Sequence, residues 1–110
     1  MNLLEETIEA IKQSGHEIED IVFIGSQSSG HSCTWSQFEV LANHEYDDGF
    51  GTQEIAIDLI IAFTDGATMW RYGYDGSEWW YYSAPFKMPG ETKPIKTLFG
   101  EYSSLAEINR

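Results

Sequence analysis

The sequence predicts a single α+β domain over residues 1–110, with an N-terminal helix and a second helix packed on one face of an antiparallel β-meander of three to five strands. Two observations carry this prediction. Between Gln53 and Ser83, three apolar-rich runs are joined by two Asp-Gly pairs, which is a strong signal for consecutive β-hairpins. Around residues 3–14 and 35–45, apolar residues instead recur at the spacing of one helix face.

The first helix is expected over residues 3–14, because the apolar residues between Leu3 and Ile11 share one stripe. Asn2 is its expected N-cap, and Gly15 is its expected stop. The outer face of this helix carries three glutamates: Glu5, Glu6 and Glu9.

The remaining elements follow from local signals. Residues 20–26 read as a short strand that is apolar on both faces, which favours an inner position in the sheet. The second helix, residues 35–45, begins at a capping box whose first residue is Thr34. Near the C-terminus, residues 95–99 are expected as a short edge strand and residues 103–109 as a closing helical turn.

Two-residue turns at Asp65-Gly66 and Asp75-Gly76 would set the register of the meander. The first turn pairs Ile61 with Trp70, and the second pairs Trp70 with Tyr81. Because side chains alternate along a strand, both turns assign the same residues to each face. The face expected to form the core carries Ile55, Ile57, Leu59, Ile61, Phe63, Trp70, Tyr72, Tyr74, Trp79 and Tyr81.

The opposite face of the meander is mixed in character. It places Arg71 opposite Trp80, which suggests a cation–π pair. Aromatic residues and arginine are typical anchors of protein interfaces. This face is therefore the expected aromatic partner-binding surface, with Met69, Arg71, Trp80 and Tyr82 as its candidate residues.

The charge of the chain is strongly acidic and unevenly distributed. The formal net charge is −12. Residues 1–60 hold 12 acidic residues and one base, Lys12, whereas residues 61–110 hold 6 acidic residues and 5 bases. Such a chain is repelled by DNA, RNA and anionic membranes, so the expected partner is a basic protein surface.

The candidate acidic contacts lie on the first helix and on the segment that follows the second helix. A calcium loop in that segment is disfavoured, because the spacing of an EF-hand is missing. The histidines and the cysteine lack zinc spacing, so no metal or other cofactor is expected. The candidate acidic partner-binding residues are Glu5, Glu6, Glu9, Glu45, Asp47, Asp48 and Glu54.

No catalytic motif stands out, so the chain is not expected to be an enzyme. Asp58 and Glu78 could form a carboxylate pair on one sheet face, but a flat three-stranded sheet supplies no cleft, and Arg71 offers both an ion-pair role. The single cysteine, Cys33, cannot form an internal disulfide and fits a reducing compartment. No secretory signal or transmembrane run is recognisable, which favours a cytoplasmic location.

A pattern of core, turn and acidic positions over roughly residues 35–83 carries a family resemblance. Its residues are Phe38, Leu41-Ala42, Glu45-Tyr46-Asp47, Gly49-Phe50-Gly51, Glu54-Ile55-Ala56, Asp58-Leu59 and Tyr74-Asp75-Gly76-Ser77-Glu78-Trp79-Trp80. In this pattern the chain resembles small acidic proteins encoded by bacteriophages and prophages. The resemblance implies an accessory protein in the cytoplasm of a bacterial host, and small acidic phage proteins often inhibit host machinery as anti-CRISPR proteins or DNA mimics. It transfers no functional residue.

Two hypotheses about function follow. The first is a non-enzymatic binding protein that docks its acidic surface on a basic host protein, such as a nucleic-acid-binding or defence complex, and inhibits it. The second is a self-associating interaction module in which Ile60, Met69, Trp80 and Tyr82 form an apolar patch that a two-fold dimer buries.

Overall fold

The computed structural model describes residues 1–46, 54–74, 77–83 and 88–110, and its fold belongs to the predicted α+β class. The elements are, in chain order, α1 (Leu3–Gln13), η1 (Ile18–Asp20), β1 (Ile21–Gly25), β2 (His31–Ser32), α2 (Trp35–Ala42), β3 (Ile60–Phe63), β4 (Thr68–Tyr74), β5 (Ser77–Ser83), β6 (Lys93–Pro94) and α3 (Leu105–Ile108).

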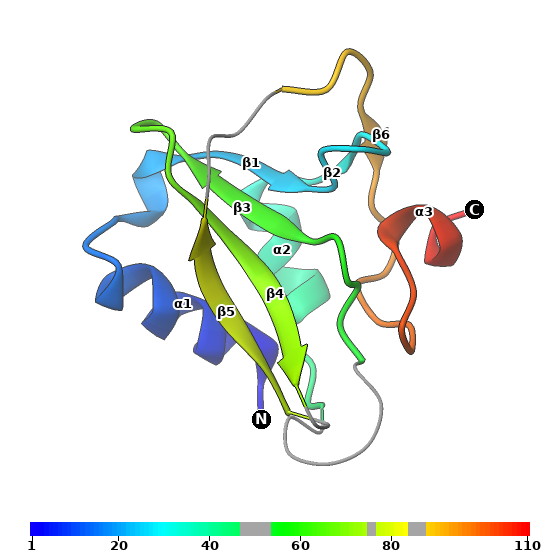
Figure 1. Ribbon diagram of the computed structural model, residues 1–110, viewed down its shortest axis with the longest axis horizontal. Helices are drawn as coiled ribbons and strands as arrows, with labels where there is room; N and C mark the ends of the chain where they lie inside the picture. Colours follow the sequence, from blue (N-terminus) through cyan, green and yellow to red (C-terminus); the bar gives the residue numbers. More distant parts are fainter. Residues whose placement is uncertain (47–53, 75–76, 84–87) are drawn as a thin grey trace.

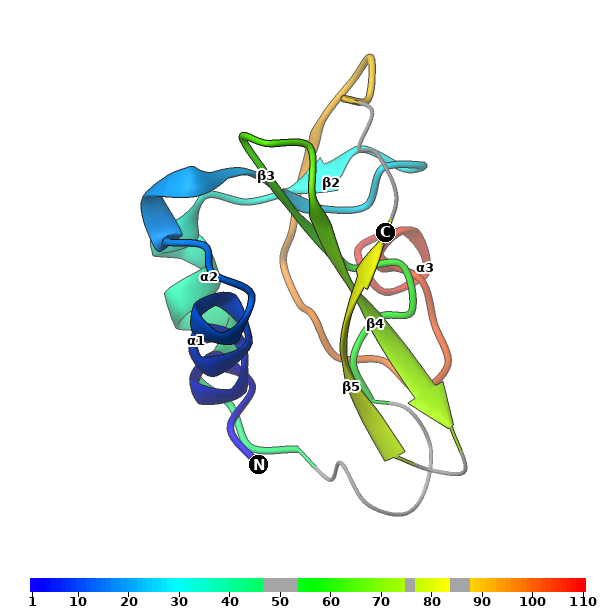
Figure 2. The same ribbon diagram turned by 60° about the vertical axis from the view of Figure 1, so that its left-hand side comes forward.

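The strands form one mixed sheet of six strands in the order β5-β4-β3-β1-β2-β6 (Figure 1). Among the strand pairs of the described residues, only β2–β6 is parallel. The count exceeds the predicted three to five, because β2 and β6 are two-residue strands without an alternation signal of their own. Helices α1 and α2 lie on the same side of the sheet, as predicted, and their buried faces enclose the core (Figure 2).

The helices form where the capping signals predict them. The side chain of Asn2 accepts a hydrogen bond from the N–H of Glu5, and Gly15 ends the first helix at a positive φ of 81°. The predicted capping box at Thr34 opens α2, which ends at Ala42, three residues earlier than expected. Helix α3 confirms the closing helical turn.

Strand β1 occupies the predicted inner position between β3 and β2. Its pairing with β3 shifts between Ile21 and Phe23, so Val22 bulges outward and is 44% exposed. The expected edge strand at residues 95–99 is wrong. The chain pairs with β2 through β6 instead, and Phe99 makes only a single bridge to Ile55.

The register of the first hairpin differs from the prediction by one residue. Ile61 pairs with Met69 rather than with Trp70. The connection has three residues, because the N–H of Phe63 bonds to the carbonyl of Ala67 and Gly66 takes the left-handed conformation, with φ of 88°. This arrangement is the three-residue hairpin that ends in a glycine bulge, which the same Asp-Gly pair can form.

The one-residue shift changes the faces of β4 and β5. Met69 and Arg71 are turned into the core, beside the correctly predicted core residues Leu59, Ile61 and Phe63. The second hairpin keeps its predicted pairs, Trp70 with Tyr81 and Tyr72 with Trp79, although its turn, residues 75–76, lies outside the described residues. The side chains of Tyr72, Tyr74 and Trp79 also lie outside what the structure describes.

Two residues assigned to the core face are exposed, and the strand before the first turn is shorter than predicted. Ile57 is 47% exposed and Tyr81 is 40% exposed. Strand β3 begins only at Ile60, because the chain turns before it and the N–H of Leu59 bonds to the carbonyl of Ala56. Ile55 and Leu59 are nevertheless fully buried. Their predicted place in the core is therefore correct, although neither residue lies in a strand of the sheet.

Candidate functional site

Helix α1 presents exposed glutamates on the side opposite its buried face. Leu3, Thr7 and Ile11 are buried at helical spacing, and Glu5 and Glu9 are exposed. The glutamates of the first turn also interact favourably with the positive end of the helix dipole. The acidic face predicted for this helix therefore exists, although one of its three glutamates is used differently.

Glu6 is turned inward and forms an ion pair with a buried arginine. Arg71 Nη1 donates to Glu6 Oε2 at 2.9 Å, and the Arg71 side chain is fully buried whereas that of Glu6 is 15% exposed. The Tyr46 hydroxyl completes the cluster by accepting from Arg71 Nη2 at 3.0 Å and donating to Glu6 Oε1. The three side chains come from α1, β4 and the segment that follows α2.

Burial and charge act together on the ionisation of this cluster. Burial raises the pKa of the Tyr46 hydroxyl well above its usual range, and the hydrogen bond to Glu6 adds to this while Arg71 opposes it. For Arg71, burial alone would lower the pKa, but the carboxylate of Glu6 and the contact with Tyr46 outweigh burial and raise it. At neutral pH, Tyr46 is therefore a neutral donor and Arg71 a permanent cation.

Trp80 joins the cluster to the helix from the neighbouring strand. Its indole Nε1 donates to Thr7 Oγ1 at 3.0 Å, and Thr7 Oγ1 in turn donates to the carbonyl of Leu3 at 2.7 Å. The Arg71 guanidinium lies 5.0 Å from the centroid of the indole ring, which confirms the predicted cation–π pair. These contacts fix the position of α1 on the β4–β5 end of the sheet.

The predicted aromatic partner surface is wrong in its central residues. Met69 is fully buried and Arg71 is 2% exposed, so neither can contact a partner. The cause is the shifted register of the first hairpin. Trp80 is half-buried and lines a surface hollow, and the side chain of Tyr82 lies outside the described residues.

The predicted acidic residues divide into three groups. Residues 1–3 pair with residues 44–46, through the bridge of Asn2 with Glu45 and the backbone bonds around it, which places Glu45 near α1. Glu54 is half-buried, and its carbonyl accepts the N–H of Gly100. Asp47 and Asp48 lie outside the described residues, and so does most of the segment for which a calcium loop is disfavoured by its sequence.

A surface hollow of about 500 Å³ lies between α1 and β5. Glu5, Glu6 and Glu9 line it from the helix, and Trp80 lines it from the strand. The structure therefore brings the helical part of the acidic set and one member of the aromatic set together at one hollow.

A second polar cluster contains a serine, a histidine and an aspartate in series. Ser14 Oγ lies 3.0 Å from His16 Nδ1, and His16 Nε2 lies 2.8 Å from Asp65 Oδ2. The order resembles a catalytic triad, but the Ser14 hydroxyl donates to the carbonyl of Ile11 and so does not offer its proton to the histidine. The His16 ring stacks on Phe63 at 4.1 Å, so the cluster ties the end of α1 to the β3–β4 turn.

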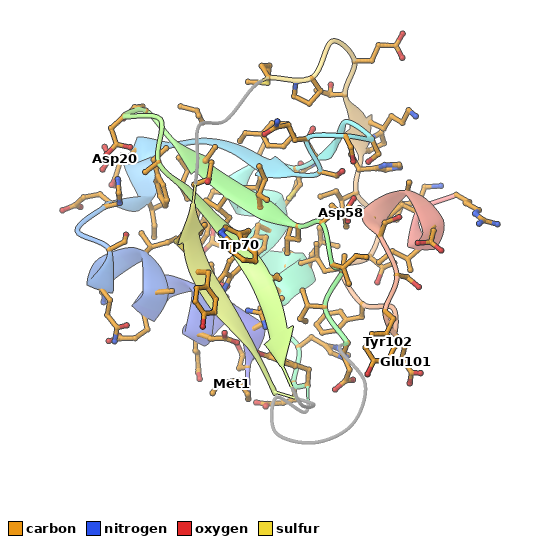
Figure 3. The ribbon with its side chains drawn as sticks, viewed as in Figure 1. Met1, Asp20, Asp58, Trp70, Glu101 and Tyr102 are labelled. Carbon is orange, nitrogen blue, oxygen red and sulfur yellow. The ribbon has the colours of Figure 1, made fainter. Side chains whose placement is uncertain are left out.

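Two other candidate chemical groups are accounted for by local structure. Asp58 Oδ1 accepts the N–H of Leu105 at 2.7 Å and so caps α3 beside it (Figure 3). Burial raises the pKa of the Cys33 thiol to about 12, which leaves it protonated and a poor nucleophile at neutral pH.

Sequence reasoning missed Tyr46 and His16. Tyr46 follows an acidic residue in a polar segment, and no spacing rule relates it to Arg71, 25 positions later. His16 follows the glycine that ends α1, and its partner Asp65 is 49 positions away. Both contacts depend on tertiary packing, so the sequence carries no local signal for them.

Within the described ranges, no three His, Cys, Asp or Glu side chains come together as metal ligands. None of the helices in that part of the chain combines the length and the hydropathy needed to cross a membrane. Comparison of the chain with family models, with curated proteins and with solved structures finds no match.

Proposed function

We propose that this protein is a non-enzymatic binding protein that docks its acidic surface on a basic surface of a host nucleic-acid-binding protein or defence complex, and thereby inhibits it. Its resemblance to small acidic phage proteins supports a phage accessory role in the bacterial cytoplasm, of the anti-CRISPR or DNA-mimic kind. The observation that carries the proposal is the distribution of charge over the fold.

Negative charge gathers at the α1 end of the molecule. Glu5 and Glu9 on α1, and Glu17 and Glu19 at η1, are all exposed. Within the described ranges, one base, Lys12, lies in this part of the chain, whereas Arg71 is buried against Glu6. The charge of this end is therefore presented to solvent almost without compensation.

The opposite end of the molecule is nearly balanced in charge, because three exposed bases there stand among three exposed glutamates, Glu91, Glu101 and Glu107. The exposed bases Lys93, Lys96 and Arg110 belong to β6, the segment after it and the C-terminus, which lie across the molecule from α1 (Figure 1). A charge distribution of this kind orients the protein as it approaches a basic surface and speeds association, most strongly at low salt. It supports docking through the α1 end.

The test is capture of partners from nuclease-treated bacterial lysate, at low and at high salt, by the tagged protein and by two charge-reversed variants. Glu5→Lys/Glu9→Lys reverses the acidic face, whereas Glu91→Lys/Glu101→Lys makes the same change of net charge at exposed positions away from it. We expect a basic nucleic-acid-binding complex to bind at low salt, to leave at high salt, and to be lost only with the first variant. Equal capture by the protein and the first variant, or equal loss with both variants, would contradict the proposal.

A second candidate function is self-association through the outer face of the sheet. The Trp70 and Tyr81 rings lie there in a tilted arrangement with their centroids 5.5 Å apart, on the face turned away from α1 and α2, and Tyr81 is 40% exposed (Figure 3). These residues, with Ile60, replace the patch expected from the sequence. The mass in solution tests this candidate: a dimer that Tyr81→Ala converts to a monomer supports it, and a monomer at high concentration contradicts it.

A further inference from the structure

The hollow beside α1 is positioned to receive a long side chain. It has a volume of about 500 Å³, with Glu5 and Glu9 on its helix side and Trp80 on its strand side. The two glutamates are exposed and one helical turn apart, so their carboxylates can approach one cationic group. The chemistry of the hollow therefore matches a lysine or arginine side chain, whose aliphatic stem packs on apolar surface while its charged end reaches carboxylates.

The Trp80 indole forms a rigid wall of the hollow, against which such an aliphatic stem can pack. Its indole is fixed by the hydrogen bond to Thr7 at 3.0 Å and by the guanidinium of Arg71 at 5.0 Å from the ring centroid. Because Thr7 and Arg71 are themselves buried, the wall does not have to be ordered when a ligand binds. A preformed wall lowers the entropic cost of binding.

The same wall belongs to the end strand of the sheet. Strand β5 has seven residues and stands first in the strand order, with β4 on one side and no further strand of the described chain on the other. The outer edge of an end strand is a template for an added strand, which bonds through its backbone while alternate side chains enter pockets on either face. A strand added beside β5 would carry its inward-pointing side chains into the hollow next to Trp80.

Charge decides which chain fits this edge. A second copy paired along β5 would bring the Glu5 and Glu9 carboxylates of both copies together, and each copy carries a net charge of −12. Juxtaposed like charges disfavour an interface, whereas an extended basic segment neutralises the same carboxylates.

We propose that an extended, lysine- or arginine-bearing segment of a partner protein adds to the β5 edge, and that one of its basic side chains enters the hollow between Trp80 and the carboxylates of Glu5 and Glu9. This inference rests on the proposed function, because it states how the basic partner is recognised.

The test uses two capped hexapeptides and nuclear magnetic resonance of the labelled full chain. A Lys-Thr-Lys-Thr-Lys-Thr peptide can add as a strand, whereas Lys-Pro-Lys-Pro-Lys-Pro has the same charge but lacks half of its backbone donors. We expect the first peptide to shift the amides of β5 and the indole N–H of Trp80 in a saturable manner. Loss of one charge-assisted hydrogen bond in Glu9→Gln should weaken its binding roughly tenfold, whereas Glu101→Gln, at an exposed position away from the hollow, should leave binding unchanged.

Three outcomes would overturn the inference: equal binding of the two peptides, shifts confined to other parts of the molecule, or no shift at all. Shifts of the β5 amides that depend on the concentration of the protein alone would also overturn it, in favour of a second copy at this edge. The lysate experiment distinguishes a failure of this inference from a failure of the proposed function. If charge reversal on α1 abolishes capture but the peptides bind alike, only the mode of recognition is wrong; if charge reversal has no effect on capture, the proposed function itself is wrong.

Discussion

The guanidinium of Arg71 and the carboxylate of Glu6 form an ion pair at 2.9 Å that joins β4 to α1 across 65 positions of the sequence. The pair removes Glu6 from the acidic surface and gives it a structural role. It also sets the distance between α1 and β5, because Trp80 packs against the same guanidinium. The hollow beside α1 therefore depends on a buried charge pair beneath it.

Removing the two partners of this pair should have unequal effects. Glu6→Ala takes away the carboxylate that faces a fully buried guanidinium, and we expect it to lower the free energy of unfolding by about 3–5 kcal/mol. Arg71→Leu should cost less, because the Glu6 side chain is 15% exposed and its carboxylate can turn to water. Urea denaturation measures both, with the exposed Glu9→Ala as a control within about 1 kcal/mol of the parent protein. An equal loss of unfolding free energy in the two variants would show that the depth of burial of the remaining charge does not determine the loss.

The buried hydroxyl of Tyr46 should make stability fall at alkaline pH. Its pKa is raised in the folded protein, by burial first, from an ordinary value of 10.0. The unfolded chain then releases this proton at a lower pH than the folded chain, so the contribution is fully present below the ordinary value and is lost as pH rises above it. Ultraviolet absorbance of tyrosinate measures the effect: the Tyr46 hydroxyl should keep its proton until the chain unfolds.

The variant Tyr46→Phe isolates this contribution. It should remove the delayed tyrosine from the titration and lower the free energy of unfolding at neutral pH by about 1–3 kcal/mol, because the buried groups that bond to the hydroxyl lose a partner. Tyr102→Phe, at an exposed position, serves as a control and should leave both the delayed tyrosine and the free energy of unfolding unchanged. An unchanged number of delayed tyrosines in Tyr46→Phe would contradict the assignment.

The faces of β4 can be tested by two truncations on opposite sides of the hairpin. Met69 is fully buried against Ile61, so Met69→Ala should cost about 2–5 kcal/mol. Tyr81→Ala should cost less, since that side chain is 40% exposed on the other face. Leu59→Ala should match Met69→Ala, because both side chains lie in the same core cluster. A larger loss of stability in Tyr81→Ala than in Met69→Ala would instead support the register with a two-residue turn.

Local signals in the sequence predicted most of the fold. Asn2, Thr34 and Gly15 delimit helices through contacts within a few residues, and such contacts depend little on the rest of the chain. The β4–β5 pairing was also correct, with Trp70 opposite Tyr81. Glu5 and Glu9 were placed on the exposed helix face for the same reason, because one stripe of apolar residues determines which side is exposed. Glu6 was placed there wrongly, because it turns inward to Arg71.

The most consequential error lies at a turn for which the sequence allows two lengths. Asp65-Gly66 is compatible with a two-residue turn and with a three-residue turn, and the sequence around it does not distinguish them. In the structure, Asp65 Oδ1 accepts the N–H of Ala67 at 3.0 Å, which favours the longer turn. This one choice decides whether Met69 and Arg71 point to the core or to solvent, and so the expected aromatic surface failed together with the register.

The carboxylate of Asp65 should stabilise the longer turn in a pH-dependent way. The N–H of Ala67 first, and His16 second, hold its pKa below the ordinary value of 3.8. The folded protein then binds fewer protons than the unfolded chain, so the contribution is fully present above the ordinary value and is lost as pH falls through the lower folded value. Asp65→Ala should therefore lower the midpoint of urea unfolding at about pH 5, and its difference from the parent protein should shrink at about pH 3. Asp65→Asn keeps the oxygen that accepts the Ala67 N–H but loses the charge opposite His16, so its midpoint should lie between the two. A difference that stays constant between these pH values would mean that the side chain acts through its shape alone, and that its charge does not hold α1 to the β3–β4 turn.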